Sequence, residues 1–108
     1  MEIKKQDVFK TILDIAHDIA GKDIPKNVNL GSSVSEFYYD MYMDSLDEIE
    51  IVMKIEKHYG INIPDDKVVA YRHKTFDDVC GFICTLINQQ KQPVSLSHKI
   101  KQLFQRTK

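Results

Sequence analysis

The helix on which the fold depends is encoded by residues 44–60, which read Asp-Ser-Leu-Asp-Glu-Ile-Glu-Ile-Val-Met-Lys-Ile-Glu-Lys-His-Tyr-Gly. At about 100° per residue, one side of this helix carries the apolar residues that would anchor it to a core: Ile51, Val52, Ile55 and Tyr59. The nearly opposite side carries a second apolar stripe: Leu46, Ile49 and Met53. One stripe is enough to attach a surface helix to its domain. We therefore predict that the second stripe is exposed, and exposed apolar patches commonly mark interaction sites.

The start of this helix carries a capping signal. Ser45 is followed three residues later by Glu48, as in a capping box, where the serine hydroxyl and the glutamate carboxylate accept hydrogen bonds from free amides of the first turn. We therefore predict that Ser45 is the N-cap residue, that the helix continues to about Tyr59, and that Gly60 ends it.

Two further segments have the periodicity of long helices. Residues 6–20 place apolar side chains at helical spacing, and Gly21 follows them, as a C-terminal glycine commonly does. The other segment, residues 76–89, follows Thr75, which has the position of an N-cap with an aspartate three residues later. Its expected buried stripe consists of Phe76, Val79, Phe82, Ile83 and Leu86.

The remaining segments are shorter or less regular. Residues 22–43 form a long polar connection whose second half, from Val34, is apolar enough to pack on a core. Pro64 disfavours helix at the residue before it, so we expect an extended link there, followed by a brief helix over residues 65–71. No segment has the alternating pattern of a strand. The sequence therefore predicts an all-α fold, a small four-helix bundle of three longer helices and one short helix, with a long first loop and a C-terminal tail.

Length and composition restrict the chain to one ordinary globular domain. It has 108 residues, of which 43% are hydrophobic and 29% charged, with 4 Gly and 3 Pro. This composition excludes a disordered, collagen-like or proline-rich protein. No apolar run approaches the ~20 residues of a membrane span, and no signal-peptide apolar core follows the N-terminus. We therefore expect a soluble cytoplasmic protein.

The residue types that build metal sites and serine hydrolases are present, but not in the required patterns. Cys80 and Cys84 lie four residues apart in an apolar run, and no second cysteine pair or His-x-x-x-His pair completes a zinc-ligand set. We expect a pair of small buried or half-buried thiols and no metal site. His58, the nearest downstream base, lies thirteen residues from Ser45 along one helix, which is about 20 Å. Nothing resembling an oxyanion loop accompanies the other histidines, so no catalytic residue is assigned.

Several motifs agree in order and spacing along most of the domain. Residues 43–47 read Met-Asp-Ser-Leu-Asp, and the helix behind them carries Glu50, Val52-Met53 and Glu56. The flanking motifs are Phe-Tyr-Tyr-Asp-Met at residues 37–41, Ile-Asn-Ile-Pro-Asp at residues 61–65 and Thr-Phe at residues 75–76. With these motifs the chain resembles the acyl carrier proteins from about residue 5 to residue 87, and its Phe-x-x-Asp-Met run is similar to the family's Phe-x-x-Asp-Leu.

The resemblance implies a non-catalytic carrier. A separate phosphopantetheinyl transferase, using coenzyme A and Mg²⁺, would attach phosphopantetheine to Ser45. The terminal thiol of that arm would carry acyl intermediates as thioesters in fatty acid, specialised lipid or polyketide-type biosynthesis. A serine at a helix N-terminus suits this role, because its phosphate would lie near free amides and the positive end of the helix dipole. Asp44 would lie beside the modified serine, close to the metal-binding site of the transferase. The alternative is a helical interaction module with the carrier fold that is not modified.

The resemblance also assigns roles to the second stripe and to its acidic border. Apolar hollows on acyl-transferring and chain-extending enzymes would receive the stripe, which consists of Leu46, Ile49 and Met53. Lys and Arg residues on the rims of those hollows would meet the acidic border, which consists of Asp47, Glu50 and Glu56. Such charges speed encounter more than they deepen affinity. We expect a carrier of this kind to act as a monomer.

The chain departs from the family pattern at two places in the motif region. Two positions before Asp44, where the family usually has a small residue and often glycine, this chain has Tyr42. The partner-facing helix carries Lys54, Lys57 and His58, where relatives are mostly acidic. A bulky side chain at position 42 either alters how the arm leaves the protein or covers the core. The bases on the helix favour different or more specialised partners. The net charge and the basic C-terminal extension favour a dedicated pathway over bulk fatty acid synthesis.

Charge divides the chain in two. Residues 1–90, the carrier-like domain, hold 10 Lys or Arg and 16 Asp or Glu, whereas residues 91–108 hold five Lys or Arg and no acid, so the net charge of -1 conceals a polarised chain. The spacing of apolar residues in this extension favours a basic amphipathic helix: Leu96, Ile100, Leu103 and Phe104. We consider three alternatives for this extension, in decreasing order of preference. The extension folds back on the domain, it docks on a partner enzyme or an anionic membrane surface, or it stays largely unfolded in isolation. Nucleic acid is the weakest target, because five dispersed charges make a small footprint.

Overall fold

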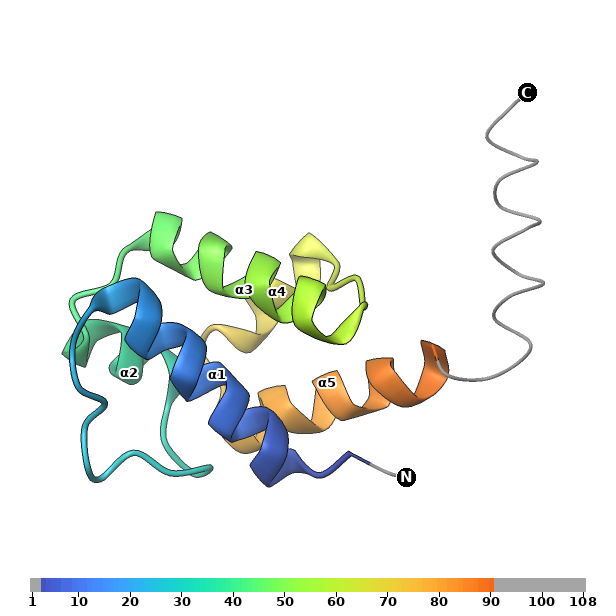
Figure 1. The fold of residues 1–108 in the computed structure, drawn as a ribbon, viewed down its shortest axis with the longest axis horizontal. Coiled ribbons are helices and arrows are strands. Elements are labelled where there is room, and N and C mark those ends of the chain that lie inside the picture. The colour runs from blue at the N-terminus through green and yellow to red at the C-terminus, as the bar shows by residue number, and fades with distance from the viewer. Residues whose placement is uncertain (1–2, 91–108) are drawn as a thin grey trace.

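The computed structural model describes residues 3–90, which form five helices and no strand (Figure 1). Three helices are long: α1 (Lys5–Ala20), α3 (Ser45–Tyr59) and α5 (Phe76–Gln90). Two are short: α2 (Val34–Asp40) and α4 (Asp65–Tyr71). The all-α prediction is confirmed. The described residues form five helices rather than the predicted four, and the additional one is the short helix α2. The amphipathic extension predicted over residues 91–108 lies outside the described residues, as does the domain boundary at residue 90.

Helix α2 lies in the segment that the sequence analysis assigned to a loop. Its N-cap is Ser33, whose side chain accepts a hydrogen bond from the Glu36 amide, and two of its apolar residues, Val34 and Phe37, are buried. Seven residues make only two helical turns. The helix therefore has only two buried side chains, too few for a helical period of apolar residues to be recognised in the sequence. The local capping serine was the signal that could have identified it.

The core forms where α1 packs between α3 and α5 (Figure 1). Phe76, the first residue of α5, lies at its centre and is almost fully buried. Its ring centroid is 5.2 Å from that of Phe9 on α1 and 5.3 Å from that of Phe37 on α2, and both pairs are tilted or edge-on. Such geometry is favourable for aromatic pairs. One aromatic cluster therefore joins three of the five helices.

The long first loop is attached to the beginning of α5 by backbone hydrogen bonds. The Val34 amide donates to the Lys74 carbonyl (3.0 Å), and the Phe76 amide donates to the Ser32 carbonyl (3.1 Å). Thr75 caps α5 as predicted, because its hydroxyl accepts from the Asp78 amide and the Asp78 carboxylate accepts from the Thr75 amide. The predicted buried stripe of α5 is partly wrong. The buried residues of this helix include Cys80 and Ile87, which were not predicted. Three predicted members of the stripe are only half-buried: Val79, Phe82 and Leu86.

The turn between α2 and α3 contains a strained residue. Tyr42 has a φ of 54° and is the one non-glycine residue with positive φ among the described residues. This conformation costs an L-residue about 1–2 kcal/mol, which explains why a glycine would suit the position. The Tyr42 side chain is exposed, and the Lys22 ammonium lies 3.8 Å from its ring centroid, a cation–π contact that partly offsets the strain.

The strain at Tyr42 predicts an unusual order of stability among variants. We expect Tyr42→Gly to be more stable than Tyr42→Ala by about 1 kcal/mol, because both lose the contact with Lys22 and only glycine adopts positive φ without cost. At the exposed helical residue Tyr39 the order should reverse, since glycine costs a helix about 1 kcal/mol relative to alanine. Urea denaturation of the four variants measures both differences. Equal stability of the two Tyr42 variants would contradict the assigned backbone conformation.

Candidate functional site

Ser45 is the first residue of α3 and is exposed, but it is not the N-cap residue. The N-cap is Asp44, whose Oδ1 accepts a hydrogen bond from the Asp47 amide (3.0 Å), while Oδ2 of Asp47 accepts from the Asp44 amide (3.1 Å). The predicted capping box of Ser45 and Glu48 is therefore wrong by one residue. Aspartate caps as well as serine does, and its negative charge is favoured at a helix N-terminus. Capping therefore does not engage the Ser45 hydroxyl.

The same cap changes the expected surroundings of a phosphate on Ser45. The Asp47 amide, one of the free donors of the first turn, is taken by Asp44. The amides of Ser45 and Leu46 are not used by the cap, and they lie at the positive end of the α3 dipole. A phosphate here would meet two backbone donors and the positive end of the helix, with the carboxylates of Asp44 and Asp47 as neighbours.

Helix α3 has the two apolar faces that its sequence predicts. Leu46 is 73% exposed and Met53 is 61% exposed, whereas Ile51 on the anchoring side is 1% exposed. Val69 on α4, which the sequence analysis did not single out, is also exposed and lines a groove between α3 and α4 together with Ile49 and Met53. Two members of the exposed stripe, Ile49 and Met53, therefore line a groove that Ser45 also lines.

The three acidic residues of the predicted border differ in what they do. Glu50 is exposed, whereas Asp47 is half-buried in the α3 cap. Glu56 is also half-buried, and its Oε2 accepts a hydrogen bond from the Ile63 amide (2.8 Å), which ties the link after α3 to that helix. Glu50 is therefore the member of the border whose carboxylate the fold leaves at the surface.

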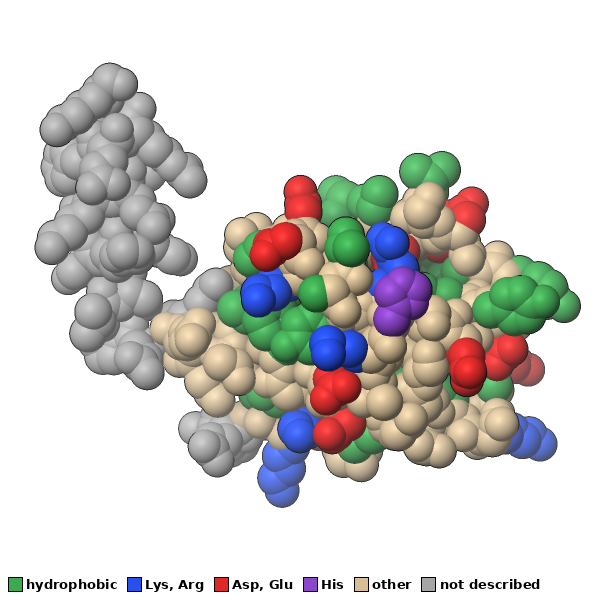
Figure 2. Space-filling model, turned by 180° about the vertical axis from the view of Figure 1, so that it is seen from behind, with side chains coloured by type: hydrophobic (Ala, Val, Ile, Leu, Met, Phe, Trp, Pro, Cys, Tyr) green, Lys and Arg blue, Asp and Glu red, His purple; other side chains and the backbone are tan. Residues whose placement is uncertain are grey.

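The second half of α3 exposes basic side chains. Lys54, Lys57 and His58 are all exposed, so acids stand near Ser45 and bases stand near the C-terminal end of the helix. Asp47 and Lys57 are ten residues apart, which corresponds to about 15 Å along the axis. Figure 2 shows the face of the molecule opposite to that of Figure 1, where acidic and basic side chains are interspersed rather than gathered by sign.

Glu48 and Arg72 form an ion pair that the sequence analysis missed. Glu48 is only 5% exposed, and its carboxylate accepts hydrogen bonds from Nε of Arg72 (3.0 and 3.2 Å) and from Nη2 of Arg72 (2.7 Å). Because the guanidinium reaches both oxygens, the pair is bidentate. The signal was present in the sequence, since Glu48 falls on the anchoring side of α3, three and four residues before Ile51 and Val52.

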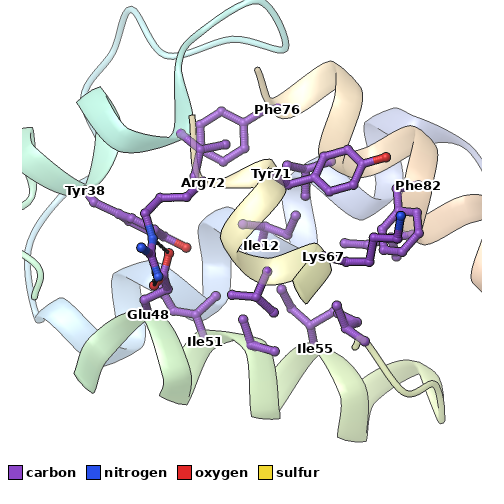
Figure 3. A pocket seen from close by; sticks show the side chains of 16 residues that line it. Ile12, Tyr38, Glu48, Ile51, Ile55, Lys67, Tyr71, Arg72, Phe76 and Phe82 are labelled. Carbon is purple, nitrogen blue, oxygen red and sulfur yellow. Dashed lines mark hydrogen bonds and ion pairs between the residues drawn. The ribbon is translucent and has the colours of Figure 1, made fainter. Parts of the chain in front are cut away.

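The ion pair borders an apolar pocket of about 60 Å³ that is lined by residues of all five helices (Figure 3). Ile51, Ile55 and Phe76 contribute to its lining, and Tyr38 lies beside the ion pair at the edge. Burial and the nearby Glu48 carboxylate raise the pKa of the Tyr38 phenol above its ordinary value, so this edge stays uncharged apart from the pair itself.

The cysteines lie where the sequence analysis expected them, and His58 lies away from Ser45. Cys80 is buried and Cys84 is half-buried, and burial raises the pKa of the Cys80 thiol to about 12, so this thiol is protonated at neutral pH. His58 stacks edge-on against Tyr59 at the end of α3 opposite to Ser45. Within residues 3–90, no three His, Cys, Asp or Glu side chains gather as metal ligands would. No helix in the described part of the chain is both long and apolar enough to span a membrane.

Comparison with known proteins identifies the family. Residues 7–83 match the family model described as a phosphopantetheine attachment site. Similar proteins named acyl carrier protein occur in Rickettsia canadensis, Rickettsia massiliae and Rickettsia typhi. Each is 35% identical to this chain over 83 residues, an alignment that covers 77% of this chain and 94% of the relative. The members of this family are carriers with a covalently bound phosphopantetheine, and they interact with a phosphopantetheinyl transferase and with biosynthetic enzymes. The chain described here, with its exposed serine at the start of α3, belongs to the acyl carrier protein family.

Proposed function

We propose that Ser45 is the residue to which phosphopantetheine is attached, and that the protein is a non-catalytic carrier of acyl thioesters. The observation that carries this proposal is the position of Ser45, which is exposed as the first residue of α3 and takes no part in the Asp44–Asp47 cap. When bound, phosphopantetheine supplies a thiol on a flexible arm that holds acyl groups as thioesters. The residues present fit this group, because the amides of Ser45 and Leu46 are available to its phosphate.

In this proposal, partner enzymes bind the exposed stripe of α3. Leu46, Ile49 and Met53 are the apolar contacts, and Val69 on α4 extends them across the groove. Asp47, Glu50 and Glu56 remain the proposed acidic border, with Glu50 as its most accessible carboxylate. These charges would guide encounter with a basic rim rather than set the strength of binding.

The reversal of charge along α3 favours dedicated partners. A complementary enzyme would present bases next to the opening that receives the arm and acids about 15 Å further along the helix. We therefore propose a pathway that makes a specialised lipid or a polyketide-type product rather than bulk fatty acids. The carrier would act as a monomer in the cytoplasm, with residues 1–90 as the carrier domain and residues 91–108 as a basic extension.

The attachment itself is tested by intact-mass measurement. After incubation with coenzyme A, Mg²⁺ and a broad-specificity phosphopantetheinyl transferase, we expect the full-length protein to gain one phosphopantetheine. Ser45→Ala should gain none, because it lacks the hydroxyl that forms the phosphodiester bond. Ser35→Ala, which removes a half-buried serine of α2, serves as a control and should be modified fully. Absence of an adduct with several transferases would favour the alternative, an interaction module that is not modified.

The proposed role of Asp44 beside the transferase metal can be separated from its capping role. Asparagine caps a helix about as well as aspartate but carries no charge, so Asp44→Asn should keep a midpoint of thermal unfolding within a few degrees of wild type. The kcat/KM of its modification should fall at least tenfold. Asp44→Ser keeps the cap by a hydroxyl and should show the same loss. An undiminished kcat/KM in Asp44→Asn would restrict Asp44 to capping.

The exposed stripe is tested at Met53. We expect Met53→Glu to leave the free energy of unfolding within about 0.5 kcal/mol of wild type, as for other surface substitutions. Its kcat/KM as a substrate of the transferase should fall at least tenfold, because burying an unpaired charge in an apolar hollow is costly. Thr85→Glu adds the same charge on the exposed side of α5 and is the matched control. A large loss of stability in Met53→Glu would mean that Met53 belongs to the core.

A further inference from the structure

The groove between α3 and α4 is an apolar surface that residues 3–90 leave open. Three of the apolar side chains that line it are more than half exposed: Ile49, Met53 and Val69. Its volume is about 350 Å³, more than twice the about 150 Å³ of an apolar cavity that admits a benzene ring. The groove therefore has room for several apolar side chains of an occupant, and exposed apolar patches commonly mark interaction sites.

Both walls of the groove also carry carboxylates. Glu56 lines it from α3, and Asp65 lines it from the start of α4. The ion pair of Glu48 and Arg72 lines it too, but the two charges of the pair cancel. The two lysines of α3 are exposed and do not line the groove. The groove is therefore complementary to an apolar stripe that has bases on both of its sides.

The basic extension, residues 91–108, has this pattern. It contains no acid, and at about 100° per residue its bases fall on the two sides of the predicted apolar stripe. Lys99 and Arg106 lie on one side, and Lys101 and Lys108 lie on the other. The stripe itself consists of Leu96, Ile100, Leu103 and Phe104. The extension lies beyond residues 7–83, which match the family model, so it is a feature of this chain rather than of that model.

The extension begins close enough to the groove to reach it. The C-terminal ends of α3 and α5 lie at the same end of the bundle (Figure 1). Burial and the neighbouring Cys84 thiol of α5 raise the pKa of the Tyr59 phenol, which places the end of α3 beside α5. Cys84 precedes the end of α5 by six residues, about 9 Å. Residues 91–95 span up to about 17 Å when extended, so they bring Leu96 to the end of the groove that Glu56 lines.

The length of the stripe matches the length of the groove. From Leu96 to Phe104 the stripe covers eight residues, about 12 Å along a helix. The α3 residues that line the groove extend from Ser45 to Glu56, which is eleven residues or about 16 Å. A helix that enters at Glu56 and runs antiparallel to α3 therefore brings Phe104 within one turn of Ser45.

We propose that the basic extension docks as an amphipathic helix in the groove between α3 and α4 of its own domain. Its apolar stripe fills the groove, and its bases meet Glu56 and Asp65 on the two walls. Resting on the carrier function proposed above, the docked extension covers the partner-facing stripe of α3 and the surroundings of Ser45 until an enzyme displaces it.

Covalent attachment makes a weak contact sufficient for this docking. A short linker gives the extension an effective concentration of the order of 1 mM at the groove. A contact with a Kd of about 0.1 mM would then be closed about ten times as often as it is open. A helix of this length is marginal in isolation, so the cost of ordering the extension keeps the contact weak. An enzyme with a larger interface therefore displaces it.

The test uses tryptophan fluorescence of the full-length protein. The chain contains no tryptophan, so Phe104→Trp places a single reporter on the stripe. Met53→Lys/Val69→Lys in this background puts two bases into the groove and should undock the extension. We expect the emission of Phe104→Trp to lie at shorter wavelength than that of the groove variant. Its constant for quenching by acrylamide should be at least about twofold lower, because a docked ring is shielded from water.

Two further variants in the same background separate docking from a general effect of charge. Asn27→Lys/Tyr39→Lys adds two bases at exposed positions outside the groove and should keep the docked emission. Lys99→Glu/Lys101→Glu reverses one base on each side of the stripe and should undock the extension while the domain is unchanged. This variant decides the outcome if circular dichroism shows that the groove variant is unfolded.

Three results would overturn the proposal. The first is equal emission and equal quenching in Phe104→Trp and in the variants designed to undock it. The second is a shift in emission that grows with protein concentration, which would assign the extension to the groove of a second copy. The third is a shift that occurs only with vesicles of anionic phosphatidylglycerol, which would assign the extension to a membrane surface.

The covering of Ser45 is measured separately, as kcat/KM for the attachment of phosphopantetheine. Lys99→Glu/Lys101→Glu without the reporter should be modified with a kcat/KM at least about threefold above that of wild type, because its groove is open. Lys10→Glu/Lys26→Glu makes the same change of net charge at exposed positions of the domain and should match wild type. A lower kcat/KM in the extension variant would overturn the covering of Ser45. Failure to modify any of these proteins would refute the carrier function alone, because the fluorescence still decides the docking.

Discussion

Burial of Ile51 and Ile55 in the core is the interaction on which the rest of the molecule depends. Both side chains are buried on α3, which packs on α1, and full burial of such a side chain contributes about 1.5–3 kcal/mol. The contact fixes the rotation of α3 about its own axis. Because residues three and four positions apart share a face, this rotation turns Glu48 inward and sends Met53 outward. The partner-facing stripe and the buried carboxylate are thus two consequences of one packing interaction.

The rotation of α3 is predictable from the sequence, whereas the register of its cap is not. The rotation follows from the period of the apolar residues alone, which is why the prediction that Met53 is exposed is confirmed. Asp44 and Ser45 are both good N-cap residues, and they differ by a single position. The choice between them depends on Asp47, which reaches back to the Asp44 amide. Capping by side chains can therefore be recognised in a sequence without its exact position being fixed.

The remaining errors concern short elements and long-range pairs. Helix α2 has only Val34 and Phe37 as buried residues, so its period is too brief to stand out within a long polar connection. The Glu48–Arg72 pair joins residues 24 positions apart. A carboxylate on an anchoring stripe predicts that some base lies opposite to it, because buried charges are paired. It does not say which base, since that depends on where the α4 backbone passes, and the sequence of α4 has no buried residue to fix its place.

A polar attachment gives α4 a different behaviour from that of the three long helices. Buried ion pairs add little to the free energy of unfolding compared with apolar packing. The main effect of this pair is therefore to fix the distance and orientation of Arg72 relative to Glu48. The contact from Arg72 to Glu48 is 2.7 Å long at its shortest, and a displacement of about 1 Å takes it beyond hydrogen-bonding distance. Because Val69 of the same helix lines the partner-facing groove, release of α4 would alter that groove. The contact between Arg72 and Glu48 and the surface offered to enzymes are therefore coupled through one short helix.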